Sequence, residues 1–332
     1  MGTTVLGAGS WGTALAIQLC RAGRSVTLWA RNPEHVNDMI ETRENRRYLP
    51  GFHLPPSLAP TADFEAAVRS ANELLVCGVP SHAVRETMAA ARENIPSQTV
   101  VCSAAKGIEE GTSKRMSEVI TETTGCGDRV SVLTGPSFAR EVAAEMPTVV
   151  TAAAHSAETA KFVQHIFASP MFRVYASEDP IGAEVGAAVK NVIAIAAGVS
   201  DGLGLGHNTR AAIITRGLAE VNRLAIKLGA DPLTVTGLAG MGDLVLTCTG
   251  ELSRNRSVGL KLGQGQKLAD ILEGMSQVAE GVRNTLAVDE LARAAEVEMP
   301  ITVQMRCLLF ENKPPREAMV DLMTRQLKPE FH

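Results

Sequence analysis

A lysine without polar neighbours is the first residue in this sequence whose surroundings indicate chemistry. Lys190 lies in an apolar run from Val185 to Val199 in which the only other strongly polar residue is Asn191. The positions one helical turn from Lys190 are all small or apolar: Gly186, Ala187, Ile193 and Ala194. Desolvation in such a place lowers the pKa of an ammonium group and makes it usable as a proton donor and acceptor. The alternative is a lysine that reaches solvent from an otherwise buried helix.

Lys106 and Asp243 are further candidates for catalysis. Lys106 follows the apolar run Thr99–Ala104 and precedes Gly107, so we expect it at the end of a strand rather than on a helix face. A cation there neutralises an anionic substrate or stabilises an alkoxide, whereas an ordinary surface lysine has no such role. Asp243 follows Gly242, where an aspartate is either a turn former or the charge partner of a catalytic lysine.

The segment Ser253-Arg254-Asn255 predicts an anion site. Ser253 can cap a helix that runs through Leu262, which places Arg254 and Asn255 in its first turn. The positive end of the helix dipole disfavours a cation there unless an anion is bound. The arginine therefore favours a phosphate at this helix start.

The N-terminal stretch Thr3–Ala16 carries the pattern G-x-G-x-x-G, formed by Gly7, Gly9 and Gly12 between an apolar run and a helical pattern. The first glycine allows a tight turn, the second lets the backbone approach a pyrophosphate, and the third lets strand and helix pack closely. The helix N-terminus then presents N–H groups to the phosphates. Because strand, turn and helix occur in the right order, we predict a dinucleotide-binding turn.

Arg31 bears on the choice of cofactor, because it stands at the end of the second expected strand, Ser25–Ala30. A site specific for NAD usually has Asp or Glu there to bind the ribose 2′-hydroxyl. A cation instead suits a 2′-phosphate. The sequence therefore predicts NADPH or NADH as cofactor, with NADP favoured; the alternative is that Arg31 simply ends a strand at the surface.

Apolar runs and helical patterns alternate through the first half of the chain. This alternation predicts an α/β N-terminal domain with a Rossmann-type doubly wound parallel sheet, whose ligands bind beyond the carboxyl ends of the strands. Residues 42–60, which contain several prolines, are expected to form either a loop over the adenosine side of the site or a solvated connection. Ser137 is expected to cap a helix that opens after Gly135-Pro136.

The second half of the chain has a helical period and no convincing strand. Asp179-Pro180 is a helix start, with Asp as N-cap and Pro at the first helical position. We therefore predict a Rossmann domain over residues 1–178 and an all-α C-terminal domain over residues 179–332. The apolar run around Lys190 is too short and too polar for a membrane span, so no stable membrane insertion is expected.

Composition excludes several classes of function. The net charge of −4 does not favour nucleic acid or a membrane surface as a partner. The six cysteines are scattered without a C-x-x-C pair, which is typical of a reduced, cytoplasmic protein rather than a disulfide framework or zinc site. No cluster of His, Cys and carboxylate residues has the spacing of metal ligands, so no metal is expected.

Seven short motifs together resemble the bacterial NAD(P)-dependent glycerol-3-phosphate dehydrogenases. They cover nearly the whole chain in the right order: G-A-G-S-W-G at 7–12, A-A-K-G at 104–107, G-P-S-F-A at 135–139, V-K-N at 189–191, G-x-G-D at 240–243, S-R-N at 253–255 and V-A-E-G at 278–281. The resemblance implies reversible hydride transfer between NAD(P)H and dihydroxyacetone phosphate, which gives sn-glycerol 3-phosphate for glycerophospholipid synthesis. It also implies a homodimer.

The resemblance assigns a role to each motif. Lys190 is expected to exchange the proton at the substrate oxygen, with Lys106 and Asp243 as its catalytic partners. The residues expected around the substrate are Lys106, Gly135, Ser137, Lys190, Asn191, Asp243, Ser253, Arg254 and Asn255. Those expected to touch the cofactor are Gly7, Gly9, Ser10, Trp11, Gly12, Arg31, Lys106, Ala139, Arg254, Val278 and Glu280. Eukaryotic members have a tighter loop before their R-N pair, so the backbone path from Thr247 to Arg254 is not carried over.

Two other functions share parts of this pattern. A reductase of the 3-hydroxyacid or 6-phosphogluconate type has the same two-domain plan, but Ser253-Arg254-Asn255 and the missing acid-group signature are evidence against it. A non-catalytic nucleotide sensor would keep the first half of the chain but would not need an isolated Lys190 in an apolar helix.

Overall fold

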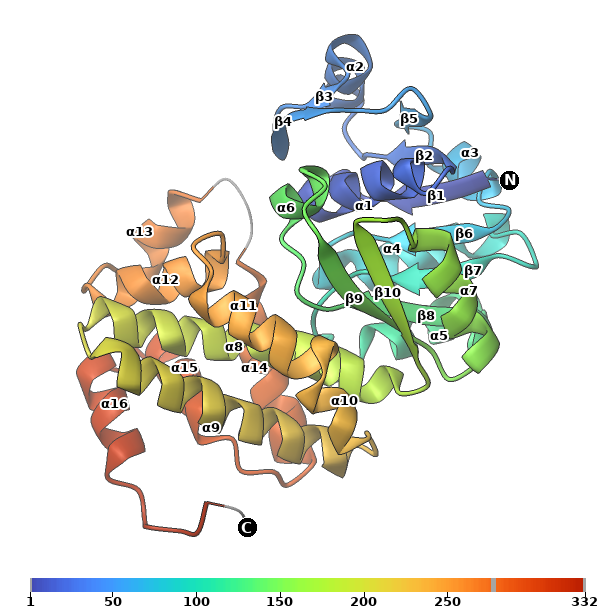
Figure 1. The fold of residues 1–332 in the computed structure, drawn as a ribbon. Helices are drawn as coiled ribbons and strands as arrows, with labels where there is room; N and C mark the ends of the chain where they lie inside the picture. Colours follow the sequence, from blue (N-terminus) through green and yellow to red (C-terminus); the bar gives the residue numbers. More distant parts are fainter. Residues whose placement is uncertain (1, 276–278, 331–332) are drawn as a thin grey trace.

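Residues 2–275 and 279–330 are described by the structure, a computed structural model in which a sheet domain and a helical domain lie side by side (Figure 1). The sheet domain contains, in chain order, β1 (Gly2–Leu6), α1 (Ser10–Arg21), β2 (Ser25–Trp29), α2 (Pro33–Thr42), β3 (Glu44–Asn45), β4 (Leu49–His53), β5 (Leu58–Thr61), α3 (Phe64–Arg69), β6 (Leu74–Cys77), α4 (Val84–Ala91), β7 (Val100–Ser103), α5 (Met116–Thr124), β8 (Val130–Thr134), α6 (Ala139–Ala143), β9 (Thr148–Ala153), α7 (Ala157–Phe167) and β10 (Phe172–Ser177).

The sheet has eight strands in the order β10-β9-β8-β7-β6-β1-β2-β5. Every residue of β6 and β7 is buried, as expected of strands that are covered by helices on both faces. Among the described strands of this sheet only the pair β8–β9 is antiparallel, so the sheet is mostly parallel and the predicted fold class is confirmed. The strand order reverses at β1, which is where open α/β sheets bind their ligands.

The segment 42–60 is more regular than the sequence predicts. After α2, the strands β3 and β4 pair as an antiparallel hairpin, and β5 pairs in parallel with β2 at the edge of the sheet. Pro60 is tolerated in β5 because an edge strand has N–H groups without a ladder partner. The prolines do exclude a long helix, but the prediction of an irregular loop was wrong here.

Ser137 does not cap a helix. The short helix α6 begins at Ala139, and its N-cap position is occupied by Phe138. The Ser137 hydroxyl instead donates a hydrogen bond to the carbonyl oxygen of Gly135 at 2.9 Å. The prediction placed the N-cap one residue too early, and the serine stabilises the turn after β8.

The helical domain follows β10 without an intervening strand. Its elements are α8 (Pro180–Gly202), α9 (Gly206–Lys227), α10 (Pro232–Thr236), the π-helical turn η4 (Leu238–Gly242), α11 (Asp243–Thr249), α12 (Arg254–Gly263), α13 (Leu268–Glu273), α14 (Glu280–Ala294), α15 (Pro300–Phe310) and α16 (Pro315–Met323). The predicted boundary between residues 1–178 and 179–332 falls in the connection from β10 to α8 and stays a prediction.

Helix α8 is the centre of the helical domain. It runs for 23 residues and packs against α9, α11, α12 and α14. Asp179 caps it by accepting a hydrogen bond from Gly182 N at 2.9 Å, and Pro180 is its first residue, as predicted. By length and composition α8 could cross a membrane, yet 94% of its most apolar window is buried inside this fold. Its apolar character is explained by its place in the core.

Glycines bring α8 and α12 into backbone contact. A Cβ atom built on Gly259 of α12 would lie 2.0 Å from the carbonyl oxygen of Ile195 in α8, so only glycine fits there. This close packing holds the start of α12, with Arg254 and Asn255, beside the middle of α8. The two predicted functional segments are thereby brought together.

Candidate active site

One buried carboxylate holds the two lysines that the sequence singled out. Lys190 Nζ donates to Asp243 Oδ1 at 2.5 Å, and Lys106 Nζ donates to Asp243 Oδ2 at 2.8 Å. The side chains of Asp243 and Lys190 are 1% and 6% exposed, and that of Lys106 is 15% exposed. The structure therefore decides both open alternatives: Asp243 is a charge partner, and Lys190 is a buried lysine rather than one that reaches solvent.

The local fold around η4 delivers Asp243 to this place. A Cβ atom on Gly186 would lie 2.8 Å from the carbonyl oxygen of Ala239, so α8 touches the π-helical turn through a position without a side chain. Asp243 begins α11 directly after that turn, and Lys190 follows Gly186 by one turn of α8. The absence of a side chain at Gly186 thus allows the close packing that sets Asp243 beside Lys190.

Burial and charge set the protonation of the group. Desolvation is the largest effect on the pKa of Lys190 and lowers it; Asp243 opposes this change, the Lys106 cation adds to it, and the resulting pKa is about 8. Desolvation of Asp243 would raise its pKa, but the two lysines outweigh this and the net pKa is lowered. Asp243 is therefore ionised while Lys190 is close to exchanging its proton near neutral pH.

Thr247 is a member of this group that sequence reasoning missed. Its hydroxyl accepts from Lys190 Nζ at 3.0 Å and donates to the Asp243 carbonyl oxygen at 2.6 Å. A signal was present, because Thr247 follows Asp243 by four residues and so shares its face of α11. The ammonium of Lys190 is held between a carboxylate and a hydroxyl, and its third proton is left for other partners.

Lys106 lies at the carboxyl edge of the sheet, as expected. Its ammonium also donates to the carbonyl oxygen of Gly135 at 3.3 Å, and it lies 6.0 Å from the centre of the Trp11 ring. Lys106 follows β7, Gly135 follows β8, and Trp11 belongs to the first turn of α1. Segments that follow β1, β7 and β8 therefore come together around this one ammonium group.

A chain of amides joins α8 to the start of α12. Asn255 Nδ2 donates to Asn191 Oδ1 at 2.9 Å, and Asn255 Oδ1 accepts from Gly281 N at 3.0 Å. Ser253 caps α12 as predicted, accepting from Arg256 N at 3.2 Å. The backbone before it turns through Gly250, whose carbonyl oxygen accepts from Ser253 N at 3.2 Å. These contacts order the first turn of α12, where an anion is expected.

The glycine turn has room for a ligand at one position only. Gly7 has a φ of +108°, and a Cβ on Gly12 would lie 1.9 Å from the carbonyl oxygen of Gly7. A Cβ on Gly9, in contrast, would meet no heavy atom within 4 Å. Gly9 is the N-cap of α1 and has no side chain to satisfy the N–H groups of the first turn. The open side of Gly9 fits a pyrophosphate.

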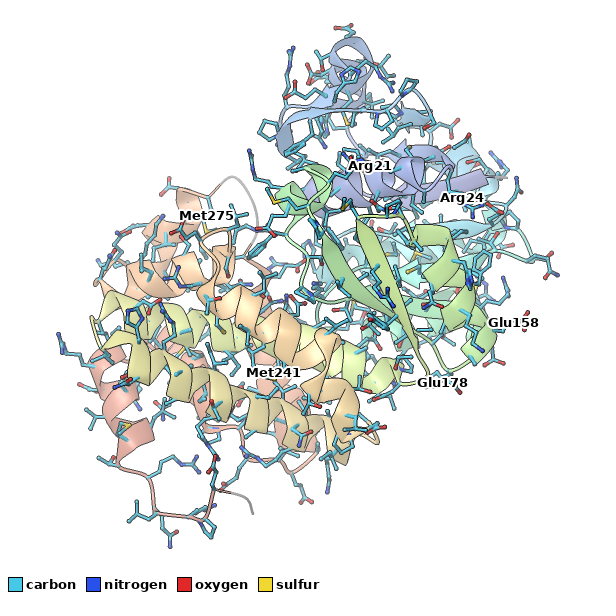
Figure 2. All side chains as sticks on the ribbon, in the orientation of Figure 1. Arg21, Arg24, Glu158, Glu178, Met241 and Met275 are labelled. Atoms are coloured by element: carbon cyan, nitrogen blue, oxygen red, sulfur yellow. The ribbon has the colours of Figure 1, made fainter. Side chains whose placement is uncertain are left out.

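A cleft of about 490 Å³ lies between the two domains, beside this turn. The sheet domain lines it with Ser10, Arg47, Tyr48, Pro50, Phe138, Ala139 and Arg140, and the helical domain with Leu252, Arg254, Gly274 and Met275. Met275, labelled in Figure 2, lies on the side of the helical domain that faces this cleft. Sequence reasoning predicted Ser10, Ala139 and Arg254 but missed Arg47, Tyr48 and Arg140, which the β3–β4 hairpin and α6 bring to the cleft.

Comparison with known families decides the assignment. The model of the NAD-dependent glycerol-3-phosphate dehydrogenase N-terminus matches residues 2–160, and the model of the C-terminus of the same family matches residues 179–320. The chain belongs to the NAD-dependent glycerol-3-phosphate dehydrogenase family. The resemblance of the seven motifs is thereby confirmed.

Similar proteins agree with this family over the full chain. The chain is 54% identical over 328 residues to glycerol-3-phosphate dehydrogenase (NAD(P)+) of Geobacter sp. (strain M21), covering 98% of each protein. The crystal structure of glycerol-3-phosphate dehydrogenase from Coxiella burnetii is 42% identical, with a TM-score of 0.92 over 98% of this chain and 99% of that one. A ketopantoate reductase from Ralstonia eutropha, at 17% identity and a TM-score of 0.60 over 96% of this chain and 100% of that one, shares the fold alone.

Two of the remaining residues expected at the cofactor, Arg31 and Glu280, lie in the described part of the chain. Arg31 is exposed just after β2 and makes no hydrogen bond or ion pair with another described residue. Glu280 begins α14; burial raises its pKa, while Arg254, Lys106 and Lys190 oppose that change. Val278 lies outside the described residues. The charges of Arg254, Lys106 and Lys190 therefore act on the Glu280 carboxyl, while its contact with the cofactor stays a prediction.

In the part of the chain that the structure describes, no three His, Cys, Asp or Glu side chains lie together in a way that could hold a metal ion. The six cysteines are free, and four of them are buried: Cys77, Cys102, Cys126 and Cys248. Burial raises the pKa of the Cys248 thiol, beside Lys190, to about 12. This thiol is therefore neutral next to the ion pair.

Proposed function

We propose that Lys190 carries the proton when this enzyme interconverts dihydroxyacetone phosphate and sn-glycerol 3-phosphate. The enzyme is an NAD(P)-dependent glycerol-3-phosphate dehydrogenase, as its family and its relatives show. The observation that carries the proposal is the Asp243 carboxylate shared by Lys190 and Lys106. A lysine with a lowered pKa is the group at this site that can give and take a proton near neutral pH.

The chemistry needs one hydride and one proton. When bound, the nicotinamide cofactor supplies the hydride that reaches C2 of the ketone. Lys190 Nζ donates its proton to the ketone oxygen as that oxygen becomes an alcohol, and in the reverse direction it accepts the proton. Lys106 stabilises the negative charge that develops on the oxygen. Asp243 and Thr247 hold the Lys190 ammonium in one orientation.

The substrate phosphate is proposed to bind at the start of α12. Arg254 lines the cleft, and the N–H groups of this helix start present a positive dipole end. Asn255 and Asn191 are fixed by their mutual hydrogen bond and order this turn. The full set proposed around the substrate is Lys106, Gly135, Ser137, Lys190, Asn191, Asp243, Ser253, Arg254 and Asn255.

The dinucleotide is proposed to lie along the glycine turn and the cleft. The open side of Gly9 and the start of α1 fit the pyrophosphate. Arg31, two residues after the end of β2, is proposed to bind a 2′-phosphate of NADPH, a role that its position after this strand supports. The full set proposed at the cofactor is Gly7, Gly9, Ser10, Trp11, Gly12, Arg31, Lys106, Ala139, Arg254, Val278 and Glu280.

The direct test is the loss of NADPH absorbance when purified protein is mixed with dihydroxyacetone phosphate. We expect turnover with this substrate and little with unphosphorylated dihydroxyacetone. Ketopantoate with NADPH, and 6-phosphogluconate with NADP+, are the controls for other reductases of related fold. Binding of NADPH without turnover of any of them would contradict the proposal and favour a nucleotide sensor.

Arg31→Asp is expected to weaken NADPH much more than NADH. One charge-assisted hydrogen bond is worth roughly 1.5–3 kcal/mol, which is about a 10- to 150-fold change in binding. The measurement is the KM of each nucleotide with dihydroxyacetone phosphate held in excess. Arg92→Asp is the matched control, because Arg92 is exposed in a turn before the amino end of β7, whereas the cofactor is proposed to bind at the carboxyl ends of the strands. An equal loss with both nucleotides would show that Arg31 has a structural role.

A homodimer in the cytoplasm, without membrane insertion, completes the proposal. The burial of α8 inside the fold supports the proposal that it does not insert into a membrane. The free cysteines support a protein that works in a reducing compartment. Its product is proposed to supply the glycerol backbone of phospholipids.

A further inference from the structure

Asn284 forms hydrogen bonds with the backbone of the two segments that carry Lys190 and Lys106. It lies on α14 and is 4% exposed. Its Nδ2 donates to the carbonyl oxygen of Ala188 at 2.6 Å, and its Oδ1 accepts from Ile108 N at 3.0 Å. Ala188 precedes Lys190 by two residues, and Ile108 follows Lys106 by two residues. One buried amide therefore contacts both segments that carry the candidate catalytic groups.

The first residues of the loop after Lys106 pack against the helical domain. Ile108 is 3% exposed and is buried in the same hydrophobic cluster as Val185, Ala188 and Val282 of the helical domain. Gly107 is closely packed, because a Cβ there would lie 2.8 Å from Ser81 and 3.5 Å from Asn284 Oδ1. Lys106 thus lies just after a strand of the sheet domain, while Ile108, two residues later, is buried in the helical domain.

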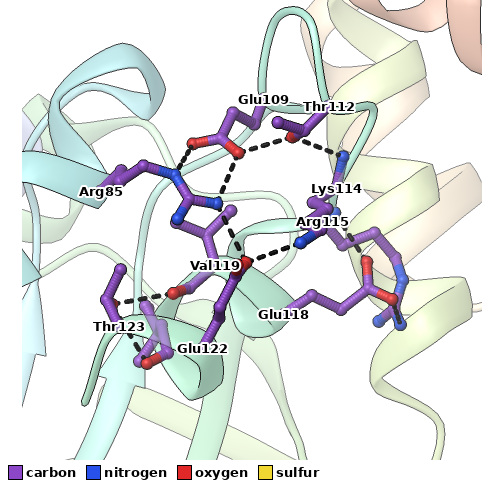
Figure 3. A network of polar contacts seen from close by, with 10 residues as sticks. Arg85, Glu109, Thr112, Lys114, Arg115, Glu118, Val119, Glu122 and Thr123 are labelled. Atoms are coloured by element: carbon purple, nitrogen blue, oxygen red, sulfur yellow. Dashed lines mark hydrogen bonds and ion pairs between the residues drawn. The ribbon is translucent and has the colours of Figure 1, made fainter.

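The outer part of this loop has separate anchors. Figure 3 shows Arg85 paired with Glu109 at 2.8 Å and with Glu122 at 3.0 Å, and Lys114 paired with Glu122 at 2.7 Å. These side chains are partly exposed, and all of them come from the sheet domain. They hold the loop to its own domain, whereas Asn284 holds it to α8.

We infer that Asn284 is a positioning residue, which fixes Lys106 opposite Lys190 so that both lysines share Asp243. The inference rests on the proposed function, because Asn284 acts through Lys106 and Lys190. Asn284 itself is assigned no contact with substrate or cofactor. Its side chain is suited to the task, since one amide offers a donor and an acceptor at fixed geometry. The Ala188 carbonyl has a second lone pair and accepts this bond beside the bond within the helix.

The test is a double-mutant cycle between Asn284→Leu and Lys106→Ala. Leucine keeps the approximate volume and removes both hydrogen bonds. We expect Asn284→Leu alone to lower kcat by about 10- to 100-fold, the effect of displacing a catalytic group by roughly 1 Å. In the Lys106→Ala background the same change is expected to cost less than about threefold, because there is no ammonium left to position. Thr285→Val, at the next buried position of α14, is the matched control and should leave kcat unchanged.

A pH profile gives a second readout that a purely structural residue would not change. The charged and titratable groups that face Lys190 are Asp243 and Cys248 from α11, Lys106 from the loop after β7 and Glu280 from α14. If Asn284→Leu displaces Lys106, Lys190 loses a nearby cation that lowers its pKa. Asp243 then pairs with Lys190 alone, which raises the pKa of Lys190. The midpoint of the reductive kcat profile should therefore move to higher pH in Asn284→Leu.

The outcomes separate this inference from the function it rests on. No turnover of dihydroxyacetone phosphate by the wild-type enzyme would contradict the proposed function itself. An equal loss from Asn284→Leu in both backgrounds, with an unmoved pH midpoint, would overturn the inference and leave the function intact. Asn284→Ala is made in parallel and used if circular dichroism shows that the leucine variant is unfolded. Failure of both variants to fold would assign Asn284 to stability and also overturn the inference.

Discussion

Lys190→Met is expected to lower turnover by about 10²- to 10⁴-fold, the usual contribution of a positioned general acid or base. Methionine keeps the length and the apolar packing of the side chain but removes the proton. The fold and NADPH binding should survive, because the buried position then holds an apolar group. The measurement is kcat for dihydroxyacetone phosphate, with NADPH binding followed by fluorescence.

Two variants control this experiment. Lys190→Arg should fail nearly as badly, since a guanidinium group is planar and keeps its proton. Lys227→Met, at the exposed end of α9, removes a lysine far from Asp243 and should leave turnover unchanged. Unfolding of Lys190→Met, or retention of more than about a tenth of wild-type turnover, would move the role elsewhere, with Lys106 the next residue to test.

Arg254→Ala is expected to raise the KM for dihydroxyacetone phosphate by about 10- to 150-fold. The physical reason is the loss of charge-assisted hydrogen bonds to a phosphate, worth roughly 1.5–3 kcal/mol. Activity on unphosphorylated dihydroxyacetone, however low, should change little, because that substrate has no phosphate to lose. The comparison of kcat/KM for the two substrates isolates the phosphate contact.

Arg254→Lys is the matched variant for charge. It keeps the cation but loses the planar fork that binds two phosphate oxygens, so it should lie between wild type and Arg254→Ala. A parallel fall in kcat/KM for both substrates in Arg254→Ala would show that Arg254 does not bind the phosphate.

Several parts of this molecule follow from local sequence. The glycine turn is recognisable because Gly7 and Gly12 each satisfy a steric demand of one strand-turn-helix unit, while Gly9 leaves open the side expected to face the pyrophosphate. Lys190 is recognisable because residues three and four positions apart lie side by side on a helix. The apolar residues at these positions therefore predict that Lys190 is buried, as it is. Ser253 and Asp179 are also recognisable from local sequence, because each caps a helix through a hydrogen bond to a residue only three positions further along the chain.

Other parts depend on contacts between distant segments. From the sequence, Asp243 is equally consistent with a turn former and a charge partner. The ion pair that distinguishes them joins Asp243 of α11 to Lys190 of α8, which lie 53 positions apart in the sequence. Asn284 and Ile108 are 176 positions apart, and nothing near either residue in the sequence predicts their hydrogen bond. The parallel pairing of β5 with β2 likewise depends on the sheet edge, which a local sequence rich in proline does not reveal.

The pH dependence of kcat in both directions tests the role of Lys190 most directly. Reduction requires the ammonium, so kcat for dihydroxyacetone phosphate should fall as the pH rises through the Lys190 pKa of about 8. Oxidation of glycerol 3-phosphate requires the neutral amine, so its kcat should rise through the same value. Lys190→Met should lose both transitions. Flat wild-type profiles across this range, or the same transitions in Lys190→Met, would contradict Lys190 as the proton carrier.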